Sequence, residues 1–496
     1  MEAAEVVPGG STHILASERE VTRLGESVFR TGRISEQAIQ FTCGVLARMA
    51  AQYRALDVVG VRAVATSSVR DARNQAEFVA RASEAMNAPV EVISGREEAR
   101  LIQLGVVSRW PHPGKRVLIV DIGGGSVEVI GVDNDRMTDA VSKQLGALRL
   151  QQMFLPDDPP AERALHQMCE YVTEKLADAT RRVGVGHWDR VIATSATASA
   201  VVCAIAGIPR PRRDTADRLR ASTTQLRRLY RKLSALPLAE RRKVTGIGPR
   251  RAEIIVAGAG ILLTILEEFR QPSLNYSAAG VRDGIIADLA GRGVGRELAR
   301  LSRDQRREVE RMSVRYGVAL KHSRKVAAFG DVLFHALAPV HRLPPSYGKL
   351  LEAAAYLHDT GHFVSDASHH KHSYYVVANS DMPGFTARER EVVANLCRYH
   401  RKAMPAADHS NTRALNAEEK RAVVLLAPLL RVADSLDRSH EQRIDSIRCR
   451  IEPGQVVIEP AFSVDIDLEA WATERAAAVF REVYNLPIVL GARGKA

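Results

Sequence analysis

A strand–turn–strand hairpin near residue 120 constrains the fold of this chain more than any other feature of its sequence. The apolar run 117–122 predicts a buried strand, Gly123-Gly124-Gly125-Ser126 predicts a turn, and residues 127–132 predict the returning strand. A nucleotide-binding βαβ unit would instead continue from its glycine turn into a helix. The sequence therefore places a glycine-rich loop at the tip of a hairpin, at the end of a buried strand.

Strands and helices alternate on both sides of this hairpin. Upstream, we expect a hairpin over 5–16, a helix capped by Ser35 that reaches about residue 56, a strand over 59–66, a helix over 74–86 and a strand over 90–93. Such alternation is typical of α/β layers. We therefore predict two α/β regions, over residues 1–115 and 116–292.

The character of the sequence changes after a glycine-punctuated boundary near 292–298. Helical periodicity dominates to about residue 438, and ten of the fifteen histidines fall between His322 and His409. Two short strands around Pro453-Gly454, a helix from Asp467 and a closing strand over 486–490 follow. These patterns predict an all-helical domain over 297–440 and a small α+β unit over 441–496.

Composition and charge limit the possible partners. The 496 residues include 70 Lys+Arg against 58 Asp+Glu, a formal net charge of +12, and the segment 210–251 carries fourteen basic residues against three acidic ones. This surplus favours a polyanionic partner, although a solvated helical face is the usual explanation of such a run. Only 5% of residues are aromatic and no nucleic-acid recognition motif is present, so we expect no specific nucleic-acid partner.

Cysteine usage and the amino terminus indicate the compartment. The five cysteines are far apart and form no CxxC pair, which fits a reducing environment. The segment MEAAEVVPGG has neither the basic nor the apolar region of a signal peptide. We expect a cytoplasmic protein without a membrane-spanning segment.

The hairpin loop and its flanking acids form the first candidate site. Three glycines let the backbone approach an anion closely and offer N–H donors, while Asp121 and Glu128 supply the hard oxygen ligands that suit Mg²⁺. A phosphate cradle beside metal-binding carboxylates is what phosphoryl transfer to water requires. A flexible hairpin tip is the alternative interpretation of the glycines alone.

Further polar residues follow other predicted strands. Glu98 lies at the start of a helix, where it could deprotonate a water or merely stabilise the helix terminus. Thr194, Ser195 and Thr197 offer hydroxyl and N–H donors to a phosphate. Arg70 can bind phosphate with two hydrogen bonds, or can be an ordinary exposed arginine.

Several dispersed segments, in this order, resemble the exopolyphosphatase / guanosine pentaphosphate phosphohydrolase family. They are ATSSVRDARN (65–74), ISGREEARLI (93–102), VDIGGGSVEVI (120–130), LGALRL (145–150), ATSATAS (193–199), GIGPRRAEIIVAGAGIL (246–262) and SAAGVRDGI (277–285). The resemblance covers nearly the whole chain. It implies duplicated actin-like, ribonuclease-H-like (ASKHA) lobes with the active site between them, and a homodimer.

The resemblance also implies an activity and its residues. It implies Mg²⁺-assisted hydrolysis of terminal orthophosphate from inorganic polyphosphate, or alternatively of the 5′-phosphate of pppGpp. Glu98 corresponds to the family's general base, Asp121 and Glu128 to its phosphate-loop acids, and Arg70 to its phosphate-contacting arginine. The family's first phosphate loop, which resembles D-x-G-S-N-S, has no counterpart before the hairpin at 5–16, so we expect the natural protein to start upstream.

The histidine-rich region resembles an HD domain. His322, the adjacent pair His358-Asp359, and Asp434 recur in the order of that domain's metal ligands, with His372 and His400 as secondary candidates. Imidazole and carboxylate together suit Mn²⁺, Fe²⁺, Zn²⁺ or Ni²⁺. Two further alternatives stay open: an HD metallohydrolase acting on a nucleotide, and a non-catalytic protein that binds polyphosphate or an alarmone.

Overall fold

The computed structural model describes residues 1–6, 12–292, 299–406 and 408–491. The chain divides into two compact units, Met1–Gly291 and Arg292–Ala496, each described by itself below. The division falls at the edge of the predicted boundary at 292–298, most of which lies outside the described residues. None of the described helices combines the length and the apolarity that crossing a bilayer requires.

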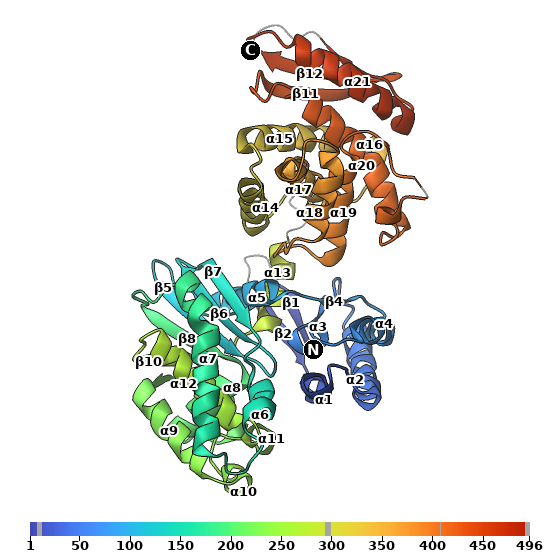
Figure 1. The fold of residues 1–496 in the computed structure, drawn as a ribbon. Helices are drawn as coiled ribbons and strands as arrows, with labels where there is room; N and C mark the ends of the chain where they lie inside the picture. Colours follow the sequence, from blue (N-terminus) through green and yellow to red (C-terminus); the bar gives the residue numbers. More distant parts are fainter. Residues whose placement is uncertain (7–11, 293–298, 407, 492–496) are drawn as a thin grey trace. The chain divides into compact units, whose positions relative to one another are not determined.

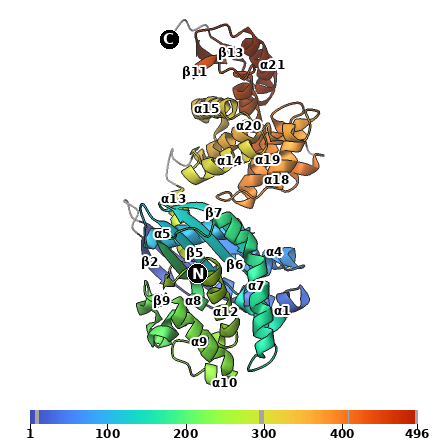
Figure 2. The ribbon, with the colours of Figure 1, turned by 60° about the vertical axis from the view of Figure 1, so that its left-hand side comes forward.

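A six-stranded mixed sheet forms the centre of the first unit (Figures 1 and 2). Its strand order is β7-β6-β5-β8-β10-β9, with bounds β5 Arg116–Ile122, β6 Val127–Asp133, β7 Arg136–Lys143, β8 Arg190–Thr194, β9 Arg220–Ser222 and β10 Ser273–Tyr276. β5, β6 and β7 form an antiparallel meander, and β8 lies parallel to β5. The predicted hairpin at 117–132 is therefore confirmed, with the glycine loop between β5 and β6.

The side chains of β5 point alternately to the two faces of this sheet, as in any strand, and pack in two different hydrophobic cores. Leu118 and Val120 belong to a large core shared with five helices, which are α6 Ala147–Phe154, α7 Glu162–Val183, α8 Ser195–Ala206, α9 Thr223–Ala235 and α12 Ile255–Glu268. Val117 and Ile119 pack on the opposite face against α5 Gly95–Arg109. The helix α5, which the sequence analysis placed in the region 1–115, thus packs directly on this sheet.

The first 115 residues contribute two separate strand pairs. β1 Glu2–Val6 pairs antiparallel with β2 Thr12–Ser17, while β3 Ala63–Ala65 pairs parallel with β4 Val90–Val92. The helices are α1 Leu24–Thr31, α2 Glu36–Ala55, α3 Ser67–Arg70 and α4 Gln75–Met86. The predicted hairpin at 5–16 is present as β1 and β2, although its turn lies outside the described residues. As expected, the Ser35 side chain caps α2 by accepting from the amide of Ala38.

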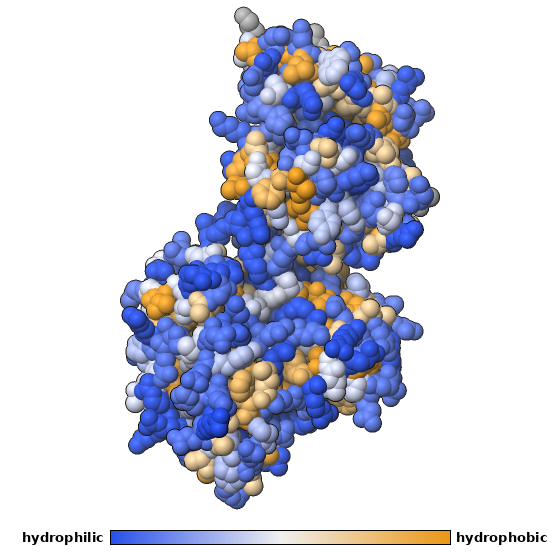
Figure 3. Space-filling model, in the orientation of Figure 1, coloured by the Kyte–Doolittle hydropathy of each residue, from blue (hydrophilic) through white to orange (hydrophobic). Residues whose placement is uncertain are grey.

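Short helical elements complete the first unit. They are η1 Arg210–Ala216, α10 Leu238–Arg241, α11 Pro249–Ala252 and α13 Val281–Gly291. The basic segment 210–251 therefore spans several short elements and α9 instead of one helical face. On the side of the first unit that Figure 3 presents, hydrophilic side chains prevail and apolar ones gather in small groups.

The second unit has one hydrophobic core that joins its helices to its small sheet. The helices are α14 Arg303–Arg315, α15 Leu320–Ala336, α16 Ala338–His341, α17 Gly348–Leu357, α18 His369–Ala378, α19 Ala387–Tyr399, α20 Ala417–Ser435 and α21 Asp467–Tyr484. β11 Ile444–Glu452 and β12 Gln455–Phe462 form the hairpin predicted around Gly454, and β13 Ile488–Leu490 lies parallel to β12. The regions predicted as 297–440 and 441–496 thus share one core.

Candidate functional site

The glycine loop is held in shape by tight packing against two other segments. Gly123 donates its amide hydrogen to the carbonyl of Ser126, which closes the turn. A Cβ atom on Gly125 would collide with Phe29 and with the hydroxyl of Ser67, and one on Gly146 would collide with the backbone of Gly124. Glycine is therefore required at positions 125 and 146 because neighbouring atoms leave no room for a side chain, and not because the backbone there must be flexible.

The carbonyl groups of the loop bond to the start of α6, whereas two of its amides stay free. The amides of Ala147 and Leu148 donate to the carbonyls of Gly123 and Gly124. The N–H groups of Gly124 and Gly125 donate to no acceptor among the described residues. Adjacent backbone amides that lack an internal acceptor are suited to an anion.

Three carboxyl groups meet beside this loop. Asp121 is the penultimate residue of β5 and lies directly opposite Glu128 on β6, and Glu98 lies in the first turn of α5. All three are buried. Burial raises the pKa of Glu98 to about 7, and the charge of Asp121 adds to this effect while Arg70 opposes it.

The pKa values of the other two carboxyl groups rise for related reasons. Burial raises the pKa of Asp121 to about 6. The pKa of Glu128 lies well above its ordinary value because of burial, and because Glu98 and Asp121 are near. Mutually repelling acids in a buried site gain most from a positive ion, and hard carboxylate oxygens match Mg²⁺. The residues therefore fit the metal that the sequence predicted.

The paired acids Glu97 and Glu98 have different surroundings. Glu97 belongs to a buried ion-pair network, in which it contacts Arg100 at 2.7 Å and Arg62 at 3.0 Å. Asp288 of α13 contacts the same two arginines, Arg100 at 2.7 Å and Arg62 at 2.8 Å. Glu98 instead faces Arg70, whose guanidinium lies 3.5 Å from its Oε2 and donates to the Ile93 carbonyl at 2.6 Å. Only the second acid is thus available to the site.

The predicted hydroxyl groups tie α8 to the end of β5. Ser195 and Thr197 both donate to the carbonyl of Ile122, at 2.9 and 3.3 Å, and Thr194 donates to the carbonyl of Ala279. Thr197 is fully buried. Ser195 adopts a left-handed backbone conformation, with φ of 69°, at the start of α8. These hydroxyls therefore position the strand ends, and Thr194 and Ser195 also line the pocket described next.

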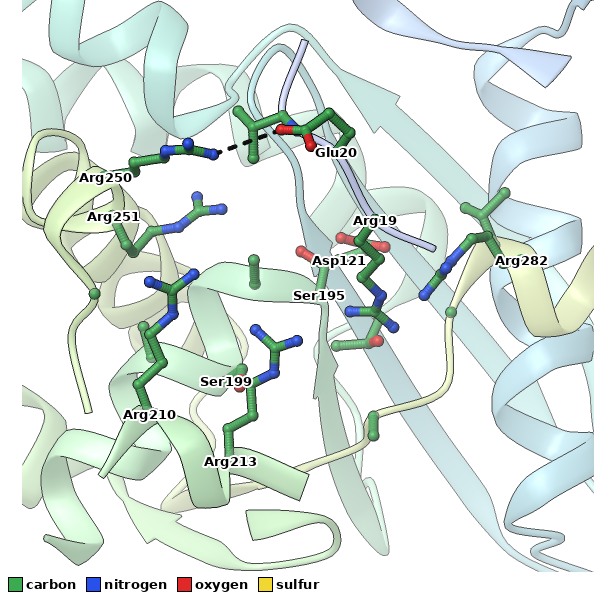
Figure 4. A pocket seen from close by; sticks show the side chains of 18 of the residues that line it. Arg19, Glu20, Asp121, Ser195, Ser199, Arg210, Arg213, Arg250, Arg251 and Arg282 are labelled. Carbon is green, nitrogen blue, oxygen red and sulfur yellow. Dashed lines mark hydrogen bonds and ion pairs between the residues drawn. The ribbon is translucent and has the colours of Figure 1, made fainter. Parts of the chain in front are cut away.

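A cavity of about 790 Å³ opens beside Asp121 and Ser195 (Figure 4). Seven arginines line it: Arg19, Arg23, Arg210, Arg213, Arg250, Arg251 and Arg282. Several acids also line it, but Glu18 pairs with Arg48, Asp283 with Arg109 and Glu253 with Arg242.

Four of the pocket arginines have no carboxylate partner. Arg19, Arg210, Arg213 and Arg251 form no ion pair within the described part of the chain, although Arg251 donates weakly to Thr197 at 3.5 Å. In Figure 4 the side chains of Arg210, Arg213 and Arg251 extend into the same open space. Burial, and then the proximity of Arg210, lower the pKa of Arg251. Converging cations without counter-charges indicate an anion-binding pocket.

Sequence reasoning missed part of this pocket. Arg210, Arg213, Arg250 and Arg251 belong to the predicted basic segment, but Arg19 and Arg282 were not singled out. Arg19 follows β2 and Arg282 lies in the first turn of α13, so more than 250 residues separate them. Arg19 lies in no recognisable motif, and Arg282 lies in the segment SAAGVRDGI, which by itself indicates the family but no role for the arginine. Only the tertiary fold brings the two residues to one cavity.

The second unit gathers the four predicted HD-type ligands. Nε2 of His322 and Nε2 of His358 each lie 3.3 Å from Oδ1 of Asp434, and His358 Nε2 lies 3.6 Å from Oδ2 of Asp359. Both Nε2 atoms are buried and have no hydrogen-bond partner among the described residues. Burial alone would lower the pKa of His322, but the carboxylates of Asp434 and Asp437 raise it to about 9. These residues are arranged as a cation would require.

Of the two secondary candidates for this site, His400 lies beside the cluster and His372 does not. His400 lies with its Nε2 3.9 Å from Oδ1 of Asp359, as the sequence suggested. His372 lies on α18 and has no described contact with this cluster. His362 and His369, which the sequence analysis did not select, lie 3.6 Å from the same Asp359 oxygen.

The fold and the site of the first unit define an α/β protein with an arginine-lined anion pocket and a buried group of acids. A model of the Ppx/GppA phosphatase family matches residues 4–292, and a model of domain III of that family matches residues 305–467. The chain belongs to the Ppx/GppA phosphatase family. Members of this family are phosphatases that generally depend on divalent metal ions, which confirms the predicted family and reaction class at that level.

Solved structures agree with this assignment. An Aquifex aeolicus Ppx/GppA enzyme is 27% identical over 58% of this chain and 94% of its own, with a TM-score of 0.51. An exopolyphosphatase from Cytophaga hutchinsonii is 26% identical over 58% of this chain and 93% of its own, with a TM-score of 0.54. These neighbours place the α/β part among actin-like folds, as predicted, whereas the HD assignment of the second unit stays a prediction.

Proposed function

We propose that this protein is an exopolyphosphatase, which hydrolyses the terminal orthophosphate of inorganic polyphosphate with Mg²⁺. The observation that carries the proposal is the convergence of four arginines without carboxylate partners on a cavity that also contains Asp121. A linear polymer with a charge on every unit can engage several such cations at once. The free amides of Gly124 and Gly125 provide further anion donors beside the acids.

The proposed reaction assigns a role to each group. The terminal phosphate is oriented by the loop amides and by Arg70. Asp121 and Glu128 would hold Mg²⁺, which supplies charge neutralisation at the transferred phosphoryl group. Glu98 accepts a proton from a water molecule while the oxygen of that water bonds to the terminal phosphorus. The bond between this phosphorus and the bridging oxygen breaks, and the polyphosphate chain shortened by one unit leaves with the bonding electrons. The raised pKa of Glu98, about 7, suits a group that must both take up and release a proton near neutrality.

Guanosine pentaphosphate is the second candidate substrate, because its hydrolysis uses the same chemistry. The pocket lining that favours it is apolar: Val21, Ile254 and Tyr276 could pack against a guanine ring. Phosphate release from long-chain polyphosphate and from pppGpp, each with Mg²⁺, separates the two substrates. A higher kcat/KM for pppGpp would replace the first proposal with the second, and binding without release from either would leave a non-catalytic role.

We further propose that His322, His358, Asp359 and Asp434 bind one divalent transition-metal ion. The support is the pair of buried Nε2 atoms without hydrogen-bond partners, both directed at Asp434. An HD-type hydrolase would use this ion instead of the acids of the first unit. Loss of all phosphate release in His358→Ala, together with full activity in Glu98→Gln, would favour that alternative.

A further inference from the structure

Arg149, on α6, bonds to the glycine loop through both its side chain and its backbone. Its Nε donates to the carbonyl of Gly125 at 3.0 Å, and its amide donates to the carbonyl of Gly124 at 3.1 Å. A trans peptide unit is planar, so its N–H points opposite to its C=O. These hydrogen bonds therefore direct the amides of Gly125 and Ser126, which donate to no acceptor among the described residues, away from α6.

The other end of the Arg149 side chain contacts residues of the region 1–115. Nη2 of Arg149 pairs with Oδ2 of Asp71, and the guanidinium carbon lies 4.2 Å from the centre of the Phe29 ring. Asp71 directly follows α3 and is the next residue after Arg70, which orients the terminal phosphate in the proposed function. One guanidinium thus connects the loop amides with the segment that carries Arg70.

Both carboxylate oxygens of Asp71 have partners. Oδ1 accepts from Gln144 at 3.1 Å, and Oδ2, beside its pair with Arg149, lies 3.5 Å from the hydroxyl of Ser67. The side chains of Arg149 and Asp71 are only 16% and 18% exposed. A charge pair shielded from water in this way is screened less than a surface pair. The contact is therefore a fixed link between the loop and the end of α3.

Arg182, on α7, makes a comparable set of contacts that does not include the loop. It pairs with both oxygens of Asp139, at 2.8 and 3.1 Å, and donates to the Ala140 carbonyl at 3.3 Å, although it is more exposed than Arg149. Both arginines thus join a carboxylate to a backbone carbonyl, but the contacts of Arg182 reach β7. The Arg182 pair is therefore a control for the loss of such a contact as such.

We infer that Arg149 and Asp71 are positioning residues for the hydrolysis, which hold the loop amides and the guanidinium of Arg70 in one arrangement around the terminal phosphate. The inference rests on the proposed function, which orients that phosphate by the loop and by Arg70. Neither Arg149 nor Asp71 touches the substrate, and Asp71 acts through Arg149. Their loss impairs the orientation of the terminal phosphate, while the pocket arginines still bind the rest of the polymer.

Steady-state kinetics of the full chain test the inference. With long-chain polyphosphate and Mg²⁺, Arg149→Gln and the isosteric Asp71→Asn are each expected to lower kcat by about 10–100-fold, since a misplacement of about 1 Å can cost 10²-fold. Filter binding should show no loss of polyphosphate affinity, and circular dichroism should show an intact fold. Inhibition by inorganic orthophosphate, which fills only the terminal position, should weaken by a similar factor. Arg182→Gln and Asp139→Asn should retain the parental kcat.

The double variant shows whether Asp71 acts through Arg149. Once Arg149 is replaced, Asp71→Asn should lower kcat no further, because residues that act through one contact are not additive. Two independent losses that multiply would overturn this pairing.

Other outcomes separate the inference from the proposed function. Parental kcat in both single variants, unchanged inhibition by orthophosphate, or an equal loss of kcat in Arg182→Gln would overturn the inference. The proposed function would still stand if Glu98→Gln had lost turnover in the same assay. A parent protein that releases no phosphate from polyphosphate or from pppGpp would refute both.

Discussion

Asp121 and Glu128 occupy directly opposite positions on β5 and β6, with both carboxyl groups buried. Like charges that face each other across two strands destabilise a sheet. Burial raises the pKa of both residues, and at Glu128 the nearby charges of Glu98 and Asp121 raise it further. A divalent cation bound between the two carboxylates would neutralise this repulsion, which explains why such a pair can lie in the core of a sheet.

Mg²⁺ should therefore stabilise the first unit. In thermal unfolding of protein stripped of transition metals, we expect Tm to rise with Mg²⁺, since a ligand at 100 times its Kd adds about 2.7 kcal/mol. In Glu128→Gln the Mg²⁺-dependent rise should largely vanish, while the stability without metal should not fall, because the variant removes the repulsion. An unchanged Mg²⁺ response in Glu128→Gln would place the ion elsewhere.

Glu98 and its neighbour Glu97 offer a matched pair of substitutions. We expect Glu98→Gln to lower the turnover of polyphosphate by at least ~10²-fold, the scale of a lost general base, while polyphosphate still binds. The amide keeps the shape of the side chain but cannot accept the proton. Single-turnover kinetics and a filter-binding measurement check the two halves of this prediction, and near-normal turnover would remove Glu98 from its proposed role.

Glu97→Gln should act on stability instead. The substitution leaves Arg100 with Asp288 as its carboxylate partner, and leaves Arg62 with Asp288 and Glu91. Breaking a buried charge pair costs about 3–5 kcal/mol. Denaturant unfolding followed by circular dichroism measures this loss. A stability within 1 kcal/mol of the parent protein would show that the network contributes little.

The pocket arginines should determine how binding depends on salt. By analogy with counterion release from nucleic acid, each arginine that contacts the polymer contributes roughly 0.7–0.9 to the slope of log K against log salt. Arg213→Gln and Arg251→Gln are therefore expected to weaken polyphosphate binding and to flatten this slope. Arg181→Gln is the control, because Arg181 is exposed and pairs with Asp178. An unchanged slope in both pocket variants would show that the polymer binds elsewhere.

Gly146 tests the rigidity of the loop. A Cβ atom at this position collides with the backbone of Gly124 and Gly125, which cannot move without opening the loop. Gly146→Ala should therefore reduce phosphate release strongly. Gly44→Ala, on an open face of α2, should leave activity intact and stabilise the helix by up to about 1 kcal/mol. Equal activity in the two variants would contradict the proposed loop geometry.

Patterns among residues close in sequence were sufficient to predict much of the fold. The β5–β6 hairpin, the Ser35 cap of α2 and the β11–β12 hairpin at Gly454 each depend on residues close in sequence, and each was predicted. The same holds for Glu98, Asp121 and Glu128, because they lie within short recognisable segments. These segments do not reveal that Glu97 pairs with Arg62, 35 positions away, or that Asp288, 191 positions from Glu97, contacts the same arginine.

The sequence by itself determined the alternation of strands and helices, the glycine loop with its acids, and the family, since all of these are written in neighbouring residues. Only the tertiary structure decided that Arg19 and Arg282 join the basic segment around one cavity, and that His362 and His369 approach Asp359 while His372 does not. The physical reason is that an arginine or a histidine acquires its role from the charges that long-range packing brings to it, and such packing leaves no periodic trace in the chain.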